Sequence, residues 1–229
     1  EQVEGDLRFS LLGIKNVGQA GYQAIVEERE KNGLFKDIFD FISRMDGKKV
    51  NTMMLESLID AGAFDEFELN RATLKANLEK IGEYANLKNT IGIDEPPLLD
   101  IVQENKMVRL ELEKKAIGVY LSMHPLAYLK QKLQVPVIAI ARLNEYVSKN
   151  VSVLLMLTRV KVIVDKKGNE MCFIEGHDET GNVEGVVFSS TYRQVKDLLE
   201  TNKVIYIEGR IDYRDKLSLV VQRVKEISK

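Results

Sequence analysis

The 229-residue chain lacks several features that would each point to a class of protein. Its single cysteine, Cys172, excludes disulfide bonds within the chain and favours a reducing, cytoplasmic setting. It has no signal-peptide pattern and no apolar run long enough to cross a membrane, so we expect no membrane partner. Its 33 Lys and Arg residues against 35 Asp and Glu give a formal net charge of −2, which provides no general basic field for nucleic acid. Any contact with DNA must therefore be local and assisted by a larger assembly.

Catalytic groups are scarce as well. His124 has no second His, Cys or carboxylate at the spacing of metal ligands. We expect Ser122 and His124 to form the entry to a helix that begins at Pro125. The sequence predicts no catalytic residue in this chain.

What the sequence does contain is a change of hydrophobic period near residue 144. Before it, apolar residues recur at helical spacing; after it, they alternate at strand spacing. We predict an α+β chain with a helical domain over residues 1–85, a helical connector over 86–144 and a β-domain over 145–229. Pro96 and Pro97 mark an exposed, mobile stretch in the connector, ahead of a helix expected from Leu98 to Lys115.

The segment Leu12–Ile25 has the spacing of a helix-hairpin-helix motif. Lys15 and Asn16 form a tight turn, Gly18 opens a helix, and both Asn16 and Gly18 suit a positive φ. The turn amides and the first free N–H groups of the helix would then bind one phosphate of duplex DNA. The predicted contacts are Lys15, Asn16, Val17, Gly18, Gln19 and Ala20. Ala20 and Ala24 would allow close packing, and a purely structural turn is the alternative.

A second hairpin is predicted around the turn Ala61-Gly62-Ala63-Phe64. A helix beginning at Asn51 precedes the turn, and another starts near Asn70. Because Asp65, Glu66 and Glu68 surround this turn and would repel phosphate, a structural role is favoured. The two hairpins would form an all-α tandem domain around one core. A further helix is expected between them, with Leu34 in its apolar stripe and its end at Met45-Asp46-Gly47.

Beyond residue 144 the pattern is that of an OB-fold, a five-stranded β-barrel whose usual ligand is single-stranded nucleic acid. The expected elements are strands Val151–Val164, Met171–His177 and Val183–Phe188, a helix Tyr192–Leu199, and strands Lys203–Ile211 and Leu217–Val224.

In an OB-fold the ligand crosses the second and third strands between two loops, which here are basic. The predicted single-strand contacts are Arg159, Lys161, Lys166, Lys167, Phe173, Arg210, Arg214 and Lys216. Phe173 and Phe188 either stack on bases or plug the barrel ends. Glu175 and Glu184 are expected beside Phe173, so the predicted binding is weak.

Five motifs occur in the order found in one known family: Ile14–Gly18, Lys49–Asn51, Leu58–Asp65, Asn70-Arg71 and Leu121–Leu126. With a tandem hairpin before an OB-fold, essentially the whole chain resembles the C-terminal region of the bacterial DNA polymerase III α subunit. It departs from the family pattern at Asn16 and Met123, where Gly is usual. The resemblance implies part of a DNA-directed DNA polymerase, a nucleotidyltransferase, whose hairpin domain holds duplex DNA and whose OB domain lies near the single-stranded template.

The same resemblance implies limits. The family's polymerase centre, with its Mg²⁺-binding aspartates, lies in an upstream domain, and this chain has no Asp-x-Asp pair, so no cofactor is expected in it. Replisome subunits are expected partners. The sliding clamp is not favoured, because no aromatic residue lies between Ala85 and Leu110; Asn89–Ile93 is the nearest candidate segment. The chain begins at Glu1 rather than Met, so we expect a piece of a longer protein.

Three functions are compatible with this sequence. The first is a DNA-holding module. The second is a protein-interaction scaffold that docks replisome subunits with little DNA affinity of its own. The third is part of another enzyme with the same folds, such as NAD-dependent DNA ligase, and it ranks last because that family places the barrel before the hairpins.

Overall fold

The computed structural model describes residues 2–3, 6–7, 9–134, 136–213 and 215–227. The chain divides into two compact units, Glu1–Ser122 and Met123–Lys229. The expected connector over residues 86–144 is split between them, with 86–122 in the first unit and 123–144 in the second. None of the helices in the described ranges is long and apolar enough to span a membrane.

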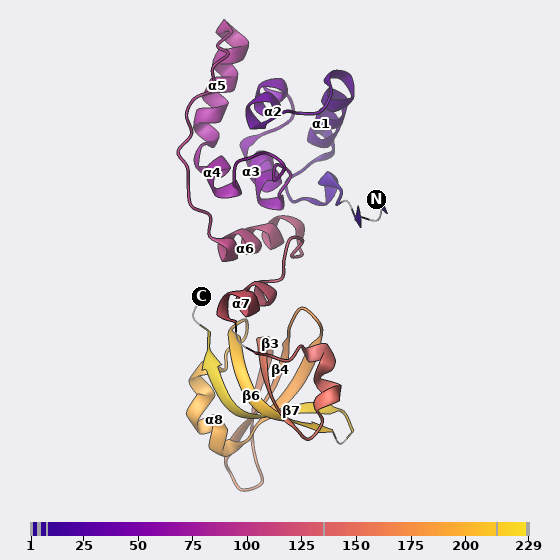
Figure 1. The fold of residues 1–229 in the computed structure, drawn as a ribbon, viewed down its shortest axis with the longest axis vertical. Helices are drawn as coiled ribbons and strands as arrows, with labels where there is room; N and C mark the ends of the chain where they lie inside the picture. The colour runs from indigo at the N-terminus through magenta and orange to yellow at the C-terminus, as the bar shows by residue number, and fades with distance from the viewer. Residues whose placement is uncertain (1, 4–5, 8, 135, 214, 228–229) are drawn as a thin grey trace. The chain divides into compact units, whose positions relative to one another are not determined.

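The first unit is helical and contains the two predicted hairpins (Figure 1). Its elements are β1 (Gln2–Val3), β2 (Asp6–Leu7), η1 (Leu11–Gly13), α1 (Gln19–Asn32), α2 (Ile38–Met45), α3 (Thr52–Ala61), α4 (Arg71–Ala76), α5 (Leu78–Ile91) and α6 (Lys106–Ile117). Ile38, Leu58, Ile59, Leu74 and Ile81 are almost completely buried and form the centre of one core. The two hairpins therefore share a single core, as predicted.

Polar side chains fix where these helices begin. Asn51 accepts a hydrogen bond from the amide of Met54, and Asn70 accepts one from the amide of Thr73. The helix expected near Asn70 is broken at Asn77 into α4 and α5. Leu34, expected in the apolar set of α2, lies before the helix and is 77% exposed.

The stretch before α6 differs most from expectation, because residues 98–105 are not helical. The side chain of Asn77 bonds both the N–H and the C=O of Asp100, each at 2.9 Å. Thr73 Oγ1 accepts from the amide of Val102 at 3.0 Å, and Asn105 caps the start of α6. The stretch expected to be mobile is therefore exposed but anchored by side chains of α4 and its flank.

The second unit is a five-stranded closed barrel, as predicted. Its strands are β3 (Asn150–Val164), β4 (Glu170–His177), β5 (Asn182–Val187), β6 (Val204–Tyr213) and β7 (Leu217–Glu226), and they pair in the order β3-β4-β5-β7-β6. Only the β5–β7 pairing is parallel among the barrel ladders. Its other elements are α7 (Pro125–Leu133), η2 (Ile140–Tyr146), α8 (Ser189–Val195), which packs against β4, and η3 (Lys196–Leu198). This connectivity is that of an OB-fold.

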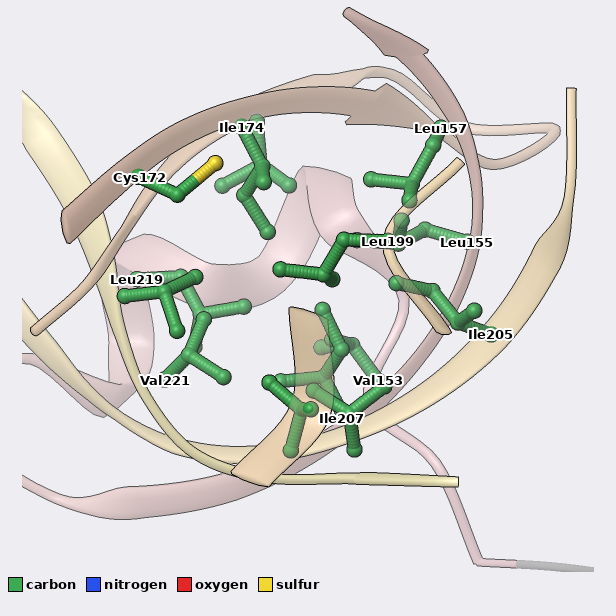
Figure 2. Close-up of a cluster of buried hydrophobic side chains, with 14 of the residues drawn as sticks. Val153, Leu155, Leu157, Cys172, Ile174, Leu199, Ile205, Ile207, Leu219 and Val221 are labelled. Carbon is green, nitrogen blue, oxygen red and sulfur yellow. The ribbon is translucent and has the colours of Figure 1, made fainter. Parts of the chain in front are cut away.

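The barrel core follows the alternation in the sequence. Val153, Leu155, Ile205 and Ile207 point inward, and Leu199 reaches the same interior from beyond η3 (Figure 2). A register shift between Leu157 and Arg159 marks a bulge, after which β3 pairs only with β4. His124 forms the expected helix entry, because its Nδ1 accepts from the amide of Leu126 at 3.2 Å. Ser122 does not share this role: its amide donates to Glu113 in the first unit.

Candidate nucleic-acid interface

The turn of the first hairpin lies between η1 and α1. Asn16 has a φ of 64°, in the left-handed region that Asn tolerates well, and its side-chain amide donates to Ser57 Oγ at 2.9 Å. The positive φ predicted at Asn16 is confirmed, and an Asn at this position is compatible with the turn. The positive φ predicted at Gly18 is wrong, since its φ is −82°. Ile14 and Val17 bury their side chains, so Val17 can reach a ligand only through its backbone.

The start of α1 offers free donors. Gly18 is the N-cap residue and supplies no side-chain acceptor. The amide of Tyr22 makes the first helical bond, to the carbonyl of Gly18, so the amides of Gln19 and Ala20 have no acceptor in the helix. In contrast, two of the turn amides already donate hydrogen bonds within the protein. The amide of Lys15 donates to the carbonyl of Ala116 at 2.8 Å, and that of Val17 to Ile14 at 3.2 Å. The possible anion site is thus the helix start rather than the whole turn.

Gly18 leaves this site open. A Cβ added there would meet no atom within 4 Å, and its φ suits any residue, so neither packing nor backbone conformation requires glycine. A missing side chain at this point does allow a ligand to approach the amides closely. The close packing of α1 is instead made at Gly21, where a Cβ would lie 2.5 Å from Met54 Sδ. Ala20, predicted to pack, is exposed.

In the second hairpin, side chains of the protein occupy the position where a phosphate would bind. At the start of α4, the amide of Arg71 donates to a carboxylate oxygen of Glu104 at 3.1 Å. The Arg71 guanidinium bonds both oxygens of Asp65, at 2.7 and 2.6 Å, and also reaches Glu113 at 3.1 Å. Burial lowers the pKa of Arg71, but its bonds with Asp65 and Glu113 outweigh that effect and raise it. These contacts agree with the structural role that the sequence favours.

On the barrel, three predicted residues lie on one register row of the outer surface. Lys161 pairs with Phe173, Phe173 with Val186, Val186 with Val220, and Val220 with Arg210. Lys161 and Arg210 are exposed at the two ends of this row. The row therefore carries an aromatic ring and apolar side chains between two cations.

The neighbouring row is mixed in charge. Arg159 pairs with Glu175 and forms an ion pair with it at 3.0 Å, while Glu175 lies opposite Glu184. Lys216 forms an ion pair with Glu184. The two carboxylates expected beside Phe173 are thus present, and they partly neutralise two of the predicted cations. This arrangement limits the attraction of the barrel for a phosphate backbone.

Phe173 and Phe188 do not plug the barrel, because 45% and 51% of their surfaces are exposed. They line an open cleft of about 530 Å³ on the outer surface. Its remaining lining residues are Met171, Val186, Asp212, Asp215, Lys216, Ser218 and Val220. Two exposed rings beside an apolar floor can accept stacked bases. Met171, Val186 and Val220 were not predicted to belong to this site, although the alternation along their strands indicates that they face outward.

The loop between β3 and β4 presents the other predicted cations. Asp165 accepts hydrogen bonds from the amides of Lys167 and Asn169, at 2.8 and 2.9 Å, which closes the loop. The bond from the Asn169 amide is the largest cause that lowers the pKa of Asp165; burial opposes it, and the bond from Lys167 adds to the lowering. Lys166 and Lys167 are exposed at the tip. Arg214 lies outside the described residues.

Metal ligation has no support in this arrangement. Across the described residues, no group of three or more His, Cys, Asp or Glu side chains converges to hold a metal ion.

The fold and these two sites define a class: a helix-hairpin-helix unit followed by an OB-fold. Family models agree, one for a helix-hairpin-helix motif matching residues 1–74 and one for an OB-fold nucleic acid binding domain matching residues 151–227.

The relatives narrow this class to one family. The chain is 34% identical to DNA polymerase III subunit alpha of Bacillus subtilis, over 96% of this chain and 21% of that protein. It is 33% identical to the subunit of the same name from Aquifex aeolicus, over 98% of this chain and 19% of that protein. The predicted resemblance to the DNA polymerase III α family is thereby confirmed, and the chain spans about a fifth of the length of these relatives.

Among solved structures, the chain is similar to the second OB-fold domain of replication protein A from Methanococcus maripaludis, with 14% identity and a TM-score of 0.33. The likeness covers 40% of this chain and 95% of that one.

Proposed function

We propose that this chain is the DNA-holding part of a bacterial DNA polymerase III α subunit. In this proposal the first hairpin binds a phosphate of duplex DNA through the start of α1, and the barrel touches the single-stranded template. Polymerisation and its Mg²⁺ ions belong to parts of the parent protein outside this chain. The buried, free Cys172 supports a reducing, cytoplasmic setting for that protein.

One observation carries the proposal: side chains bind the first backbone amides of the helix in the second hairpin, but not those in the first. Glu104 and Asn70 occupy the first amides of α4, whereas the start of α1 has no side-chain cap and an open approach past Gly18. Helix amides that are unpaired and oriented outward favour an anion. Lys15, exposed in the adjoining turn, adds a positive charge to the same site.

The barrel makes a smaller contribution in this proposal. Lys161 and Arg210 would contact the backbone of a single strand while Phe173 and Phe188 stack on its bases. The ion pairs of Arg159 and Lys216 reduce the charge available, so the barrel would bind weakly without the rest of the polymerase.

Gly18→Asp tests the hairpin, measured by fluorescence anisotropy with duplex, single-stranded and primer–template DNA at two salt concentrations. Aspartate is a better N-cap than glycine by a few tenths of a kcal/mol, so thermal stability should hold or rise. Its carboxylate would occupy the amides and repel phosphate, so we expect duplex affinity to fall by about tenfold or more, roughly 1.4 kcal/mol.

Two variants serve as controls. Gly18→Ser caps the helix without a charge and should lose less affinity than Gly18→Asp, while Gly18→Val blocks the approach without a charge and should also weaken binding. Equal duplex affinity for wild type, Gly18→Asp and Gly18→Val would contradict the proposal. Binding of a replisome subunit by a chain with no affinity for any of the three DNAs would favour the scaffold function instead.

A further inference from the structure

The end of α6 lies against the turn of the first hairpin, although the two segments are far apart in the sequence. The amide of Lys15 donates to the carbonyl of Ala116 at 2.8 Å. This bond fixes the backbone beside Lys115 to the backbone of the predicted phosphate site. The hairpin site therefore has a third structural element besides its two helical segments.

Lys15 and Lys115 line the same cavity of about 290 Å³. Both side chains are exposed, and neither forms an ion pair with a carboxylate of the described residues. Lys75, which lines the cavity too, is neutralised by Asp60 at 2.9 Å. Glu56 is the remaining carboxylate of the lining. Two ammonium groups are thus free to attract an anion against one carboxylate.

We propose that Lys115 is a second contact of this site to the DNA backbone, binding a phosphate next to the one at the start of α1. The inference rests on the proposed function. An exposed lysine on a fixed helix end can contact a phosphate as a point charge and reads no base. The effect of Lys115 is therefore independent of DNA sequence, and it extends the duplex footprint of the hairpin onto α6.

Lys114 provides a matched comparison. It occupies the adjacent position in the last turn of α6, so it interacts similarly with the helix dipole. Its ammonium lies 4.8 Å from the ring centroid of Tyr120 and is absent from the cavity lining. If a positive charge anywhere near the end of α6 were sufficient, the two lysines would contribute equally to DNA binding.

The test measures duplex affinity between about 50 and 200 mM salt for wild type, Lys115→Gln, Lys115→Arg, Lys114→Gln and Lys15→Gln. Each lost phosphate contact lowers the slope of log K against log salt by about 0.9, a change of about 3.5-fold over this range. We expect that loss for Lys115→Gln and Lys15→Gln, with two unrelated duplex sequences giving the same result. Lys115→Arg should keep the wild-type slope, and Lys114→Gln should leave it unchanged.

A wild-type slope for Lys115→Gln, alongside a reduced slope for Lys15→Gln, would overturn the contact at Lys115 and leave the proposed function standing. Equal losses for Lys114→Gln and Lys115→Gln would also overturn it, since the effect would be one of general charge. No duplex binding by the wild-type chain would overturn the proposed function, and this inference with it. Circular dichroism of each variant checks that the helices are intact.

Discussion

Replacing Arg71 with methionine tests whether the second hairpin is a structural element. The Arg71 side chain is 8% exposed and that of Glu113 is 1% exposed, and they meet at 3.1 Å. Arg71 also donates to the carbonyl of Asp60 at 2.7 Å. Glu113 accepts from the amides of Leu121 and Ser122, at 2.6 and 2.7 Å, so this pair connects the hairpin to the end of the unit.

The free energy of unfolding that Arg71→Met is expected to lose follows from the difference in burial between Asp65 and Glu113. Asp65 is 37% exposed and keeps Arg109 at 3.0 Å, so losing Arg71 there costs little. Glu113 is 1% exposed, so losing Arg71 leaves its side chain buried without the guanidinium that bonds it. Breaking a buried pair on one side costs about 3–5 kcal/mol, and we expect a value in that range for Arg71→Met.

A double-mutant cycle separates the energy of the Arg71–Glu113 interaction from the other contacts of these two residues. Glu113→Gln retains an oxygen that can accept from Leu121 and Ser122, so its own cost should be smaller, about 1–2 kcal/mol. The double variant leaves no buried charge unpaired and should cost less than the sum of the two by about 1–3 kcal/mol.

Urea unfolding followed by far-UV circular dichroism, which detects both the helices of the first unit and the strands of the barrel, measures these free energies. Arg159→Met is the control, because the Arg159–Glu175 pair is 61% and 46% exposed and should contribute less than about 1 kcal/mol. The reasoning is refuted if Arg71→Met costs no more than Arg159→Met, or if the cycle is additive.

Two further predictions concern acid stability and base stacking. Hydrogen bonds from Lys48, Asn32 and Arg44 lower the pKa of Glu28 from 4.5 to about 2. Its contribution to stability is therefore complete above about pH 4.5 and is lost as the pH falls toward about 2, and Glu28→Gln should remove that part of the pH dependence in urea midpoints. Phe173→Ala and Phe188→Ala should each weaken single-strand binding by about 1–3 kcal/mol without lowering the melting temperature, since both rings are half-exposed. If both variants bind single-stranded oligonucleotides as tightly as the wild type does, base stacking on these rings is excluded.

The features that the sequence predicted correctly are those decided by neighbouring residues. The strand predicted over Lys203–Ile211 is present, and its alternating residues Ile205, Ile207 and Ile211 are all fully buried. Asn51 and His124 cap helices because the acceptor and the amide it serves lie within three residues of each other. Such signals are local and need no knowledge of the fold.

The features that the sequence missed depend on distant partners. Residues 98–105 have an apolar pattern that suits a helix, but Asn77 and Thr73 bind their backbone and hold it in another conformation. The amide of Lys15 was expected to face a ligand and is instead bonded to Ala116. In the barrel, the positions of Arg159 and Lys216 were readable, but their carboxylate partners follow from strand register and loop geometry.

The formal net charge of −2 is a poor guide to the charge of the hairpin, because the carboxylates of the first unit are not evenly available. Asp65, Glu104 and Glu113 are bound by Arg71 and Arg109 around the second hairpin, and Glu28 is bound by Arg44 and Lys48. Lys15 and Lys115 have no such partner among the described residues, so a positive site can persist on an acidic chain. A site of so few cations predicts a shallow salt slope and modest affinity. Under the proposed function, firm binding of DNA would then require contacts beyond those that this chain provides.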